Sequence, residues 1–191
     1  KGSLKHCTHQ LKKTPEEHID GIYESLTLAM QKGMAVNLYL EDWSSGMKDS
    51  PDYVFKMMDA LVESGIKRFL LPDTLGILNP MEVTKYFGQM VERYPDTKFE
   101  FHAHNDYDLA VANSLAAVVS GASGLHVTVN GLGERCGNAP LASVQAILKD
   151  QLGIETSIRE DRLGEISRLV EGYSGIAIAP NQPIVGENVF T

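Results

Sequence analysis

The sequence has little of what marks secreted, membrane or nucleic-acid-binding proteins. It contains only two cysteines, Cys7 and Cys136, too few for a disulfide framework, which favours the reducing cytoplasm. It has no signal peptide and no run of 18 apolar residues, so a membrane span is not expected. Basic residues are outnumbered, with 17 against 25 acidic ones and a formal net charge of −8. No basic stripe could follow a phosphate backbone, so nucleic acid is not an expected partner.

What the sequence does contain is apolar content for one substantial core. Its 191 residues are 43% hydrophobic and include 17 glycines. No linker or low-complexity stretch interrupts residues 1–178, which are predicted to form one domain, with the proline-bearing segment 179–191 leading out of it. This length suits an ordinary domain but is short for a (β/α)8 barrel of about 250 residues.

Short apolar segments alternate with amphipathic ones along the chain. Strands are predicted at residues 35–40, 68–71, 98–101 and 125–129, and helices at about 14–33, 50–65, 79–94, 108–121, 141–152 and 161–173. A repeat of roughly 30 residues is typical of βα units, so the prediction is an α/β fold with a parallel sheet. Such folds place their chemistry at the carboxyl ends of the strands.

A pair of histidines ends the third predicted strand. His102 and His104 are two residues apart, so their side chains leave the strand on one face and can converge on a metal ion. The alternative is that each only forms hydrogen bonds in a loop, and spacing and position leave the two interpretations about even. His126 is predicted to be structural, and His9 and His18 to lie on the surface.

A glycine-rich loop, residues 131–138, follows the fourth predicted strand. Its amides could hold an anion, but it matches neither a Walker loop nor a dinucleotide-binding fingerprint. A tight structural loop is therefore the better interpretation. Asn138 is the exception, because an amide oxygen beside a histidine pair is a reasonable hard ligand. Cys136 is treated as an unpaired loop cysteine without a role.

Polar residues also end the first two predicted strands. Glu41 shares a face with Tyr39 by alternation and could serve as a general acid or base, although a solvated loop acid fits equally well. Asp42 is expected to be a solvated acid. Asp73 is expected to cap or orient its turn, whereas Thr74 could hold a substrate carboxylate.

Four motifs follow one another in the chain: Leu-Pro-Asp73-Thr74-Leu-Gly76, Phe-His102-Ala-His104-Asn105-Asp106, Ala112-Asn113-Ser114-Leu115, and Asn130-Gly-Leu-Gly-Glu134-Arg135-Cys-Gly137-Asn138. In this order they resemble the acyl-CoA-condensing metalloenzymes of the DRE-TIM superfamily, which includes 2-isopropylmalate, homocitrate and citramalate synthases and related lyases. The resemblance implies a TIM (β/α)8 barrel. The Arg-Asp pair of the family's first strand is absent here, so the chain is expected to hold strands five to eight with their helices.

The resemblance further implies an acyltransferase that condenses acetyl-CoA with a 2-oxo acid, of the 2-isopropylmalate or citramalate synthase type in branched-chain amino-acid biosynthesis. A divalent metal would be held by His102, His104 and Asn138, with zinc favoured and magnesium or manganese as alternatives. Glu41 matches the acid/base position and Thr74 the position that binds the substrate carboxylate. Tyr39 would line the pocket for the oxo acid and favours the methyl group of pyruvate.

Two other functions compete with the synthase. A lyase of the same superfamily would cleave a 3-hydroxyacyl-CoA, but the Glu134-Arg135 loop resembles that of the synthases. A half barrel could also be a non-catalytic binding module. The resemblance implies a homodimer for the full-length protein, with acetyl-CoA and the 2-oxo acid as its small-molecule partners, and residues 1–191 alone are expected to be inactive.

Overall fold

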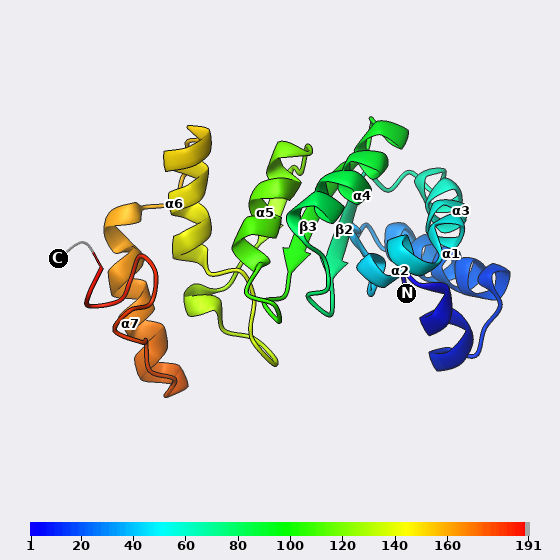
Figure 1. The fold of residues 1–191 in the computed structure, drawn as a ribbon. Helices are drawn as coiled ribbons and strands as arrows, with labels where there is room; N and C mark the ends of the chain where they lie inside the picture. Colours follow the sequence, from blue (N-terminus) through cyan, green and yellow to red (C-terminus); the bar gives the residue numbers. More distant parts are fainter. Residues whose placement is uncertain (190–191) are drawn as a thin grey trace.

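The computed structural model describes residues 1–189, which form four strands and seven α-helices with three single-turn helices (Figure 1). The strands are β1 (Leu38–Tyr39), β2 (Arg68–Asp73), β3 (Lys98–Ala103) and β4 (Gly124–His126). The α-helices are α1 (Pro15–Gln31), α2 (Trp43–Asp49), α3 (Pro51–Val62), α4 (Pro80–Arg93), α5 (Ala110–Val119), α6 (Leu141–Leu152) and α7 (Leu163–Ser174). The single turns are η1 (His6–Gln10), η2 (Val129–Gly131) and η3 (Glu160–Arg162). Within the described residues, no helix is both long and apolar enough to cross a bilayer.

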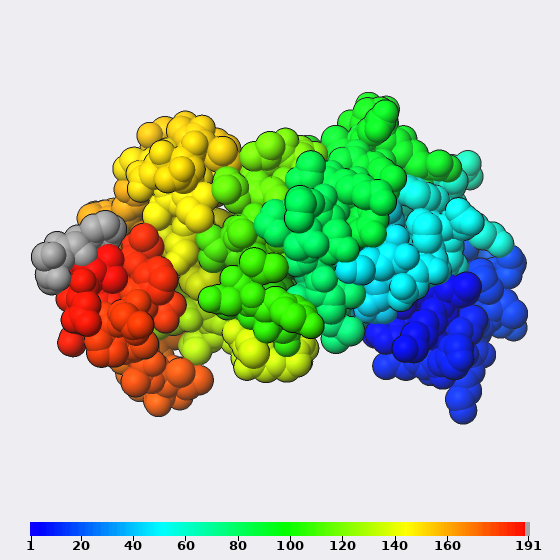
Figure 2. All heavy atoms as spheres, in the orientation of Figure 1, coloured from blue at the N-terminus to red at the C-terminus, as the bar shows by residue number. Residues whose placement is uncertain are grey.

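The four strands form one parallel sheet in the order β1-β2-β3-β4, which confirms the predicted α/β class. In the register, Pro72 of β2 lies beside His102 of β3, and His102 lies beside His126 of β4. The carboxyl ends of the strands therefore share one edge of the sheet, as the parallel arrangement requires. Figure 2 shows the segments following one another across the molecule in chain order, with the N-terminal and C-terminal segments at opposite ends.

Two helices begin where the sequence places a capping box. Thr14 accepts a hydrogen bond from the Glu17 amide, and the Glu17 carboxylate accepts one from the Thr14 amide. Asn79 and Glu82 repeat this exchange at the start of α4. In both helices proline occupies the first turn, where its missing N–H has no intrahelical partner to lose. These local signals explain why both helix starts could be predicted.

The two faces of the sheet differ in what covers them. One face is apolar and buried against the helices, with Phe87 of α4 packing its ring edge-on to Phe99 and Phe101 at centroid distances of 6.2 and 6.0 Å. The opposite face carries Glu100, His102 and further polar side chains, and it remains partly exposed. Alternation along the strands sorts the side chains in this way, and the His pair belongs to the open face.

The predicted strand boundaries were partly wrong. β1 has two residues rather than the six of 35–40, and Met34, just before that stretch, is exposed. β4 ends at His126 rather than at residue 129, because η2 follows. α5 begins at Ala110 rather than 108, and α2 was not predicted at all. Edge strands and short helices carry few periodic positions, which is why the pattern missed them.

The prediction that His18 lies on the surface is wrong, because its side chain is buried. It is 6% exposed, and its Nδ1 lies 2.6 Å from the Tyr53 hydroxyl oxygen. Burial is the largest cause that lowers its pKa to about 4. With Ile22 and Leu26 it lies on the inner side of α1, since these residues are four apart.

We expect His18 to weaken the protein at acidic pH. The unfolded chain takes up the proton near pH 6.5 and the folded chain only near pH 4, so the free energy of unfolding falls as pH is lowered through that window. Urea unfolding at pH 7 and pH 5 measures this fall, which should be smaller in His18→Gln. His9→Gln is the control, because His9 is exposed. An equal reduction in both variants would contradict the assignment to His18.

Candidate metal and substrate site

The two predicted metal-binding histidines converge at the carboxyl end of β3. Nε2 of His102 lies 3.3 Å from Nε2 of His104, and the ring planes meet at 80°. This separation is close to that of two nitrogens each about 2.0–2.1 Å from one tetrahedral ion. Burial, and next the positive charges that His104 and His126 can carry, lower the pKa of His102 to about 4. Its imidazole is therefore neutral at pH 7, the form that binds a metal.

Asn138 offers an oxygen beside this pair. A bridge between the backbones of His104 and Asn138 brings the two residues together. The Asn138 Nδ2 donates to the Leu132 carbonyl at 3.0 Å, whereas its Oδ1 is buried and without a hydrogen-bond partner in the described chain. A buried oxygen left unpaired is costly, so two imidazole nitrogens and this oxygen fit a divalent cation. Within residues 1–189 no three His, Cys, Asp or Glu side chains lie close enough together to hold a metal ion.

The loop before Asn138 is tight, as the structural interpretation expects. Gly137 has a φ of +84°, and a Cβ there would lie 2.0 Å from the Gly131 carbonyl oxygen. The Asn138 amide donates to that same carbonyl at 2.9 Å. Glycine therefore allows the loop to close on itself and to hold the Asn138 backbone in place.

Arg135, which the sequence analysis treated only as part of a motif, joins three loops. Its guanidinium donates to both carboxylate oxygens of Asp106 at 2.8 and 3.0 Å, to the Thr74 carbonyl at 2.7 Å, and to Glu134 at 2.7 Å. These hydrogen bonds lower the pKa of Asp106. Gly76 leaves the space for Asp106, since a Cβ there would lie 2.8 Å from Oδ2. The sequence signal for this contact was an acidic residue, Asp106, in one loop and a basic residue, Arg135, in the next.

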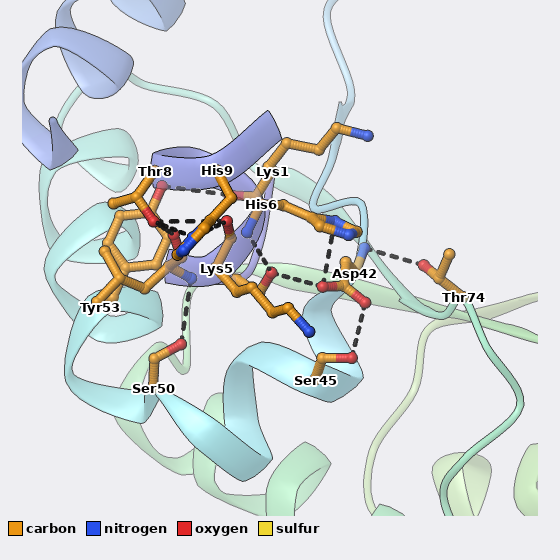
Figure 3. Close-up of polar contacts among 12 residues, drawn as sticks. Lys1, Lys5, His6, Thr8, His9, Asp42, Ser45, Ser50, Tyr53 and Thr74 are labelled. Carbon is orange, nitrogen blue, oxygen red and sulfur yellow. Dashed lines mark hydrogen bonds and ion pairs between the residues drawn. The ribbon is translucent and has the colours of Figure 1, made fainter. Parts of the chain in front are cut away.

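Thr74 and Asp42 are connected at the ends of β2 and β1. The Asp42 amide donates to Oγ1 of Thr74 at 2.9 Å (Figure 3). Asp42 was predicted to be solvated, and this is wrong: it is 2% exposed, and its carboxylate accepts hydrogen bonds from Ser3 and Ser45. The N-terminal segment folds back over the start of α2 and covers it, a long-range contact that no local pattern could reveal.

Asp73 and His126 form contacts of the structural kind that was expected. The Asp73 carboxylate accepts from the amides of Ile77 and Leu78, both at 3.0 Å, and so fixes the turn after β2. Burial raises the pKa of Asp73, and these hydrogen bonds partly offset it. Nε2 of His126 lies 2.9 Å from a Glu100 carboxylate oxygen.

The structure brings Tyr39 beside the histidine pair. Its ring centroid lies 6.0 Å from that of His102 and 6.2 Å from that of His126, on the open face of the sheet. Burial, and secondarily the charge of Glu41, raise the pKa of Tyr39. Glu41 lies two residues after the end of β1, and its carboxylate has no hydrogen-bond donor among the described residues.

A polar cavity of about 360 Å³ opens next to Asn138. Asn130, Asn105 and Cys136 are among the residues that line it, together with residues 181–183 of the C-terminal segment. Cys136 is exposed. Of the predicted site residues, only Asn138 lines this cavity, whereas the two histidines, Tyr39 and Thr74 lie outside its lining.

The fold and these motifs define a class of protein, and comparison with known families agrees with it. The model of the family described as HMGL-like matches residues 2–170. The chain therefore belongs to the HMGL-like family of the DRE-TIM superfamily, which confirms the resemblance.

Within that family the similar curated proteins are synthases. A probable 2-isopropylmalate synthase of Methanopyrus kandleri is 41% identical over 97% of this chain and 36% of its own length. A 2-isopropylmalate synthase of Sulfurisphaera tokodaii is 40% identical over 97% of this chain and 47% of its own length. A putative (R)-citramalate synthase of M. kandleri is 37% identical over 97% of this chain and 36% of its own length. The chain thus spans less than half the length of these relatives.

The similar solved structures include HMG-CoA lyases and the carboxyl transferase domain of a pyruvate carboxylase. The HMG-CoA lyase of Bacillus subtilis superposes with a TM-score of 0.77 at 22% identity, covering 91% of this chain and 61% of that one. An HMG-CoA lyase of Acinetobacter baumannii, in complex with coenzyme A and 3-methylmalate, gives a TM-score of 0.73 at 25% identity, with 91% and 59% covered. The first likeness shows the fold alone.

Proposed function

We propose that this chain is the second half of a TIM barrel, holding strands five to eight. The sheet is open at both β1 and β4, and its polar face has no covering layer in residues 1–189. In a closed barrel that face would be the interior. The half barrel corresponds to residues 1–178, with 179–191 leading out of it; the last two residues of that segment lie outside the described chain.

The helices at the two ends of the sheet support this proposal. At one end, Leu28 and Met30 of α1 are exposed, and at the other, Leu169 and Tyr173 of α7 are exposed. Apolar side chains at both open ends are what further βα units would cover. In a free half barrel, the unpaired edges of β1 and β4 would also invite association with another strand.

We further propose that the complete protein, in the cytoplasm, catalyses a Claisen-type condensation of acetyl-CoA with a 2-oxo acid. The observation that carries the proposal is the 3.3 Å approach of the His102 and His104 nitrogens, next to a backbone bridge from His104 to Asn138, whose side-chain oxygen is unpaired. These residues would hold a divalent metal, with zinc favoured by the two imidazoles and magnesium or manganese as alternatives. When bound, the metal supplies Lewis-acid polarisation of the oxo acid's carbonyl.

The chain's own side chains would bind and orient the substrate. The Thr74 hydroxyl accepts from the Asp42 amide and donates to no acceptor in the described chain, so its proton is free for the carboxylate of the oxo acid. Glu41, two residues after β1, would act as general acid or base. Tyr39 beside His102 takes volume from a branched alkyl group, which favours pyruvate and hence citramalate formation.

Condensation is favoured over 3-hydroxyacyl-CoA cleavage because the relatives near 40% identity are synthases. The test is release of free CoA by the full-length protein with acetyl-CoA and pyruvate, 2-oxoisovalerate or 2-oxoglutarate, with and without a chelator. We expect release with pyruvate that the chelator stops. No release with any oxo acid would overturn condensation, and equal rates with all three would overturn a specific role.

The half-barrel proposal has its own test. We expect residues 1–191 alone to release no CoA, because the ligand set is partial, and the full-length protein to sediment as a homodimer. CoA release by residues 1–191 alone would contradict the need for the other half. A stable dimer of that piece would instead indicate that a second copy covers the open face.

A further inference from the structure

A polar cluster outside the metal ligands joins the N-terminal segment to the substrate site. Its centre is Asp42, which is 2% exposed. One carboxylate oxygen accepts from the Ser3 hydroxyl at 2.5 Å and lies 3.2 Å from Nδ1 of His6, and the other accepts from the Ser45 hydroxyl at 2.7 Å (Figure 3). Two hydroxyls from separate segments thus hold one carboxylate, and His6 lies beside them.

The backbone of Asp42 is as unusual as its burial. Its φ is +66°, a left-handed conformation that most residues with a Cβ avoid and that Asp tolerates better than most. The chain turns sharply there between β1 and α2. As a result the Asp42 amide faces β2 and donates to Oγ1 of Thr74.

This contact fixes how the Thr74 hydroxyl can act. A hydroxyl has one proton to donate and lone pairs to accept with. The Asp42 amide occupies a lone pair at 2.9 Å, and the Thr74 carbonyl is held by Arg135 at 2.7 Å. Thr74 is therefore held by both its carbonyl and its hydroxyl oxygen. Because that hydroxyl oxygen accepts from the Asp42 amide, its proton points away from Asp42.

We propose that Asp42 is a positioning residue for substrate binding: its carboxylate anchors the left-handed turn, and its amide sets the Thr74 hydroxyl as a donor to the carboxylate of the 2-oxo acid. The inference rests on the proposed function, because it assigns the ligand of Thr74. Asp42 thus has two roles. Its carboxylate stabilises the turn, and its backbone amide orients the hydroxyl of Thr74.

The separation can be tested with Asp42→Ala and Asp42→Gly in the full-length protein. Both remove the carboxylate and should lower the thermal unfolding midpoint, but only alanine opposes the left-handed turn. We expect Asp42→Ala to raise KM for the oxo acid about tenfold, the scale of one hydrogen bond to a charged group, and Asp42→Gly to raise it much less. Asp42→Asn, which tolerates the turn and keeps an acceptor, should restore KM.

Lys12→Ala is the matched control, because Lys12 also has a positive φ, of 54°, and is exposed. It should change neither the unfolding midpoint nor KM, because lysine and alanine tolerate a positive φ about equally poorly. Equal KM values in Asp42→Gly and Asp42→Ala would overturn the role of the turn. If the double variant Asp42→Ala/Thr74→Val has a higher KM than Thr74→Val alone, the route through Thr74 is wrong.

Amide hydrogen exchange tests the contact without any activity. Exchange at the Asp42 amide should be faster in Thr74→Val and unchanged in Thr74→Ser, which keeps the hydroxyl. Unchanged exchange in Thr74→Val would overturn the proposal even in an active enzyme. If instead the exchange result holds while no oxo acid is turned over, the proposed function fails and the positioning of Thr74 remains.

Discussion

Replacing His104 with alanine is expected to remove the metal and with it the condensation activity of the full-length protein. The substitution deletes one of two nitrogens that lie 3.3 Å apart. Loss of an outer partner of a metal ligand already costs roughly 10–100-fold in affinity or activity, so loss of a ligand itself should cost at least about a hundredfold. Metal content after dialysis and CoA release should fall together.

His126→Ala is the control for this experiment. The ring of His126 lies 5.9 Å from that of His102 on the same open face, but its Nε2 is engaged by Glu100. The variant should therefore retain its metal and most of its activity. If His126→Ala loses metal as completely as His104→Ala does, the ligand assignment is wrong.

The sequence could predict those parts of the molecule that depend on local periodicity and on strand ends. Buried strands such as β2 and β3 have apolar residues bounded by turn signals, and Thr14 and Asn79 mark helix starts by chemistry within four residues. The pairing of His102 and His104 follows from strand geometry alone. These features need no knowledge of distant segments.

The buried side chains and side-chain contacts it missed depend on distant segments of the chain. Asp42 is buried only because the segment carrying Ser3 folds over it, 39 residues away. Arg135 reaches Thr74 across 61 residues, and His18 is buried by α3, which carries Tyr53. A single sequence shows the charges and hydroxyls but not which of them meet.

Gly137→Ala is the second substitution with a large expected effect. The new Cβ would lie 2.0 Å from the Gly131 carbonyl oxygen. That oxygen also accepts a hydrogen bond from the Asn138 amide. To relieve that clash, the loop must open and carry Asn138 away from the histidines. The left-handed backbone adds roughly 1–2 kcal/mol, and overpacking adds about 1–3 kcal/mol more.

Gly153→Ala separates these two costs, because Gly153 ends α6 with a φ of +64° and has no described atom within 4 Å of an added Cβ. Thermal unfolding and metal binding should be measured for both variants of the full-length protein. Gly153→Ala should lose only the backbone part of the stability and bind metal normally, whereas Gly137→Ala should lose more stability and bind metal weakly. Normal metal binding by Gly137→Ala would show that the position of Asn138 does not depend on this loop closure, and Asn138 would then lose its place among the proposed ligands.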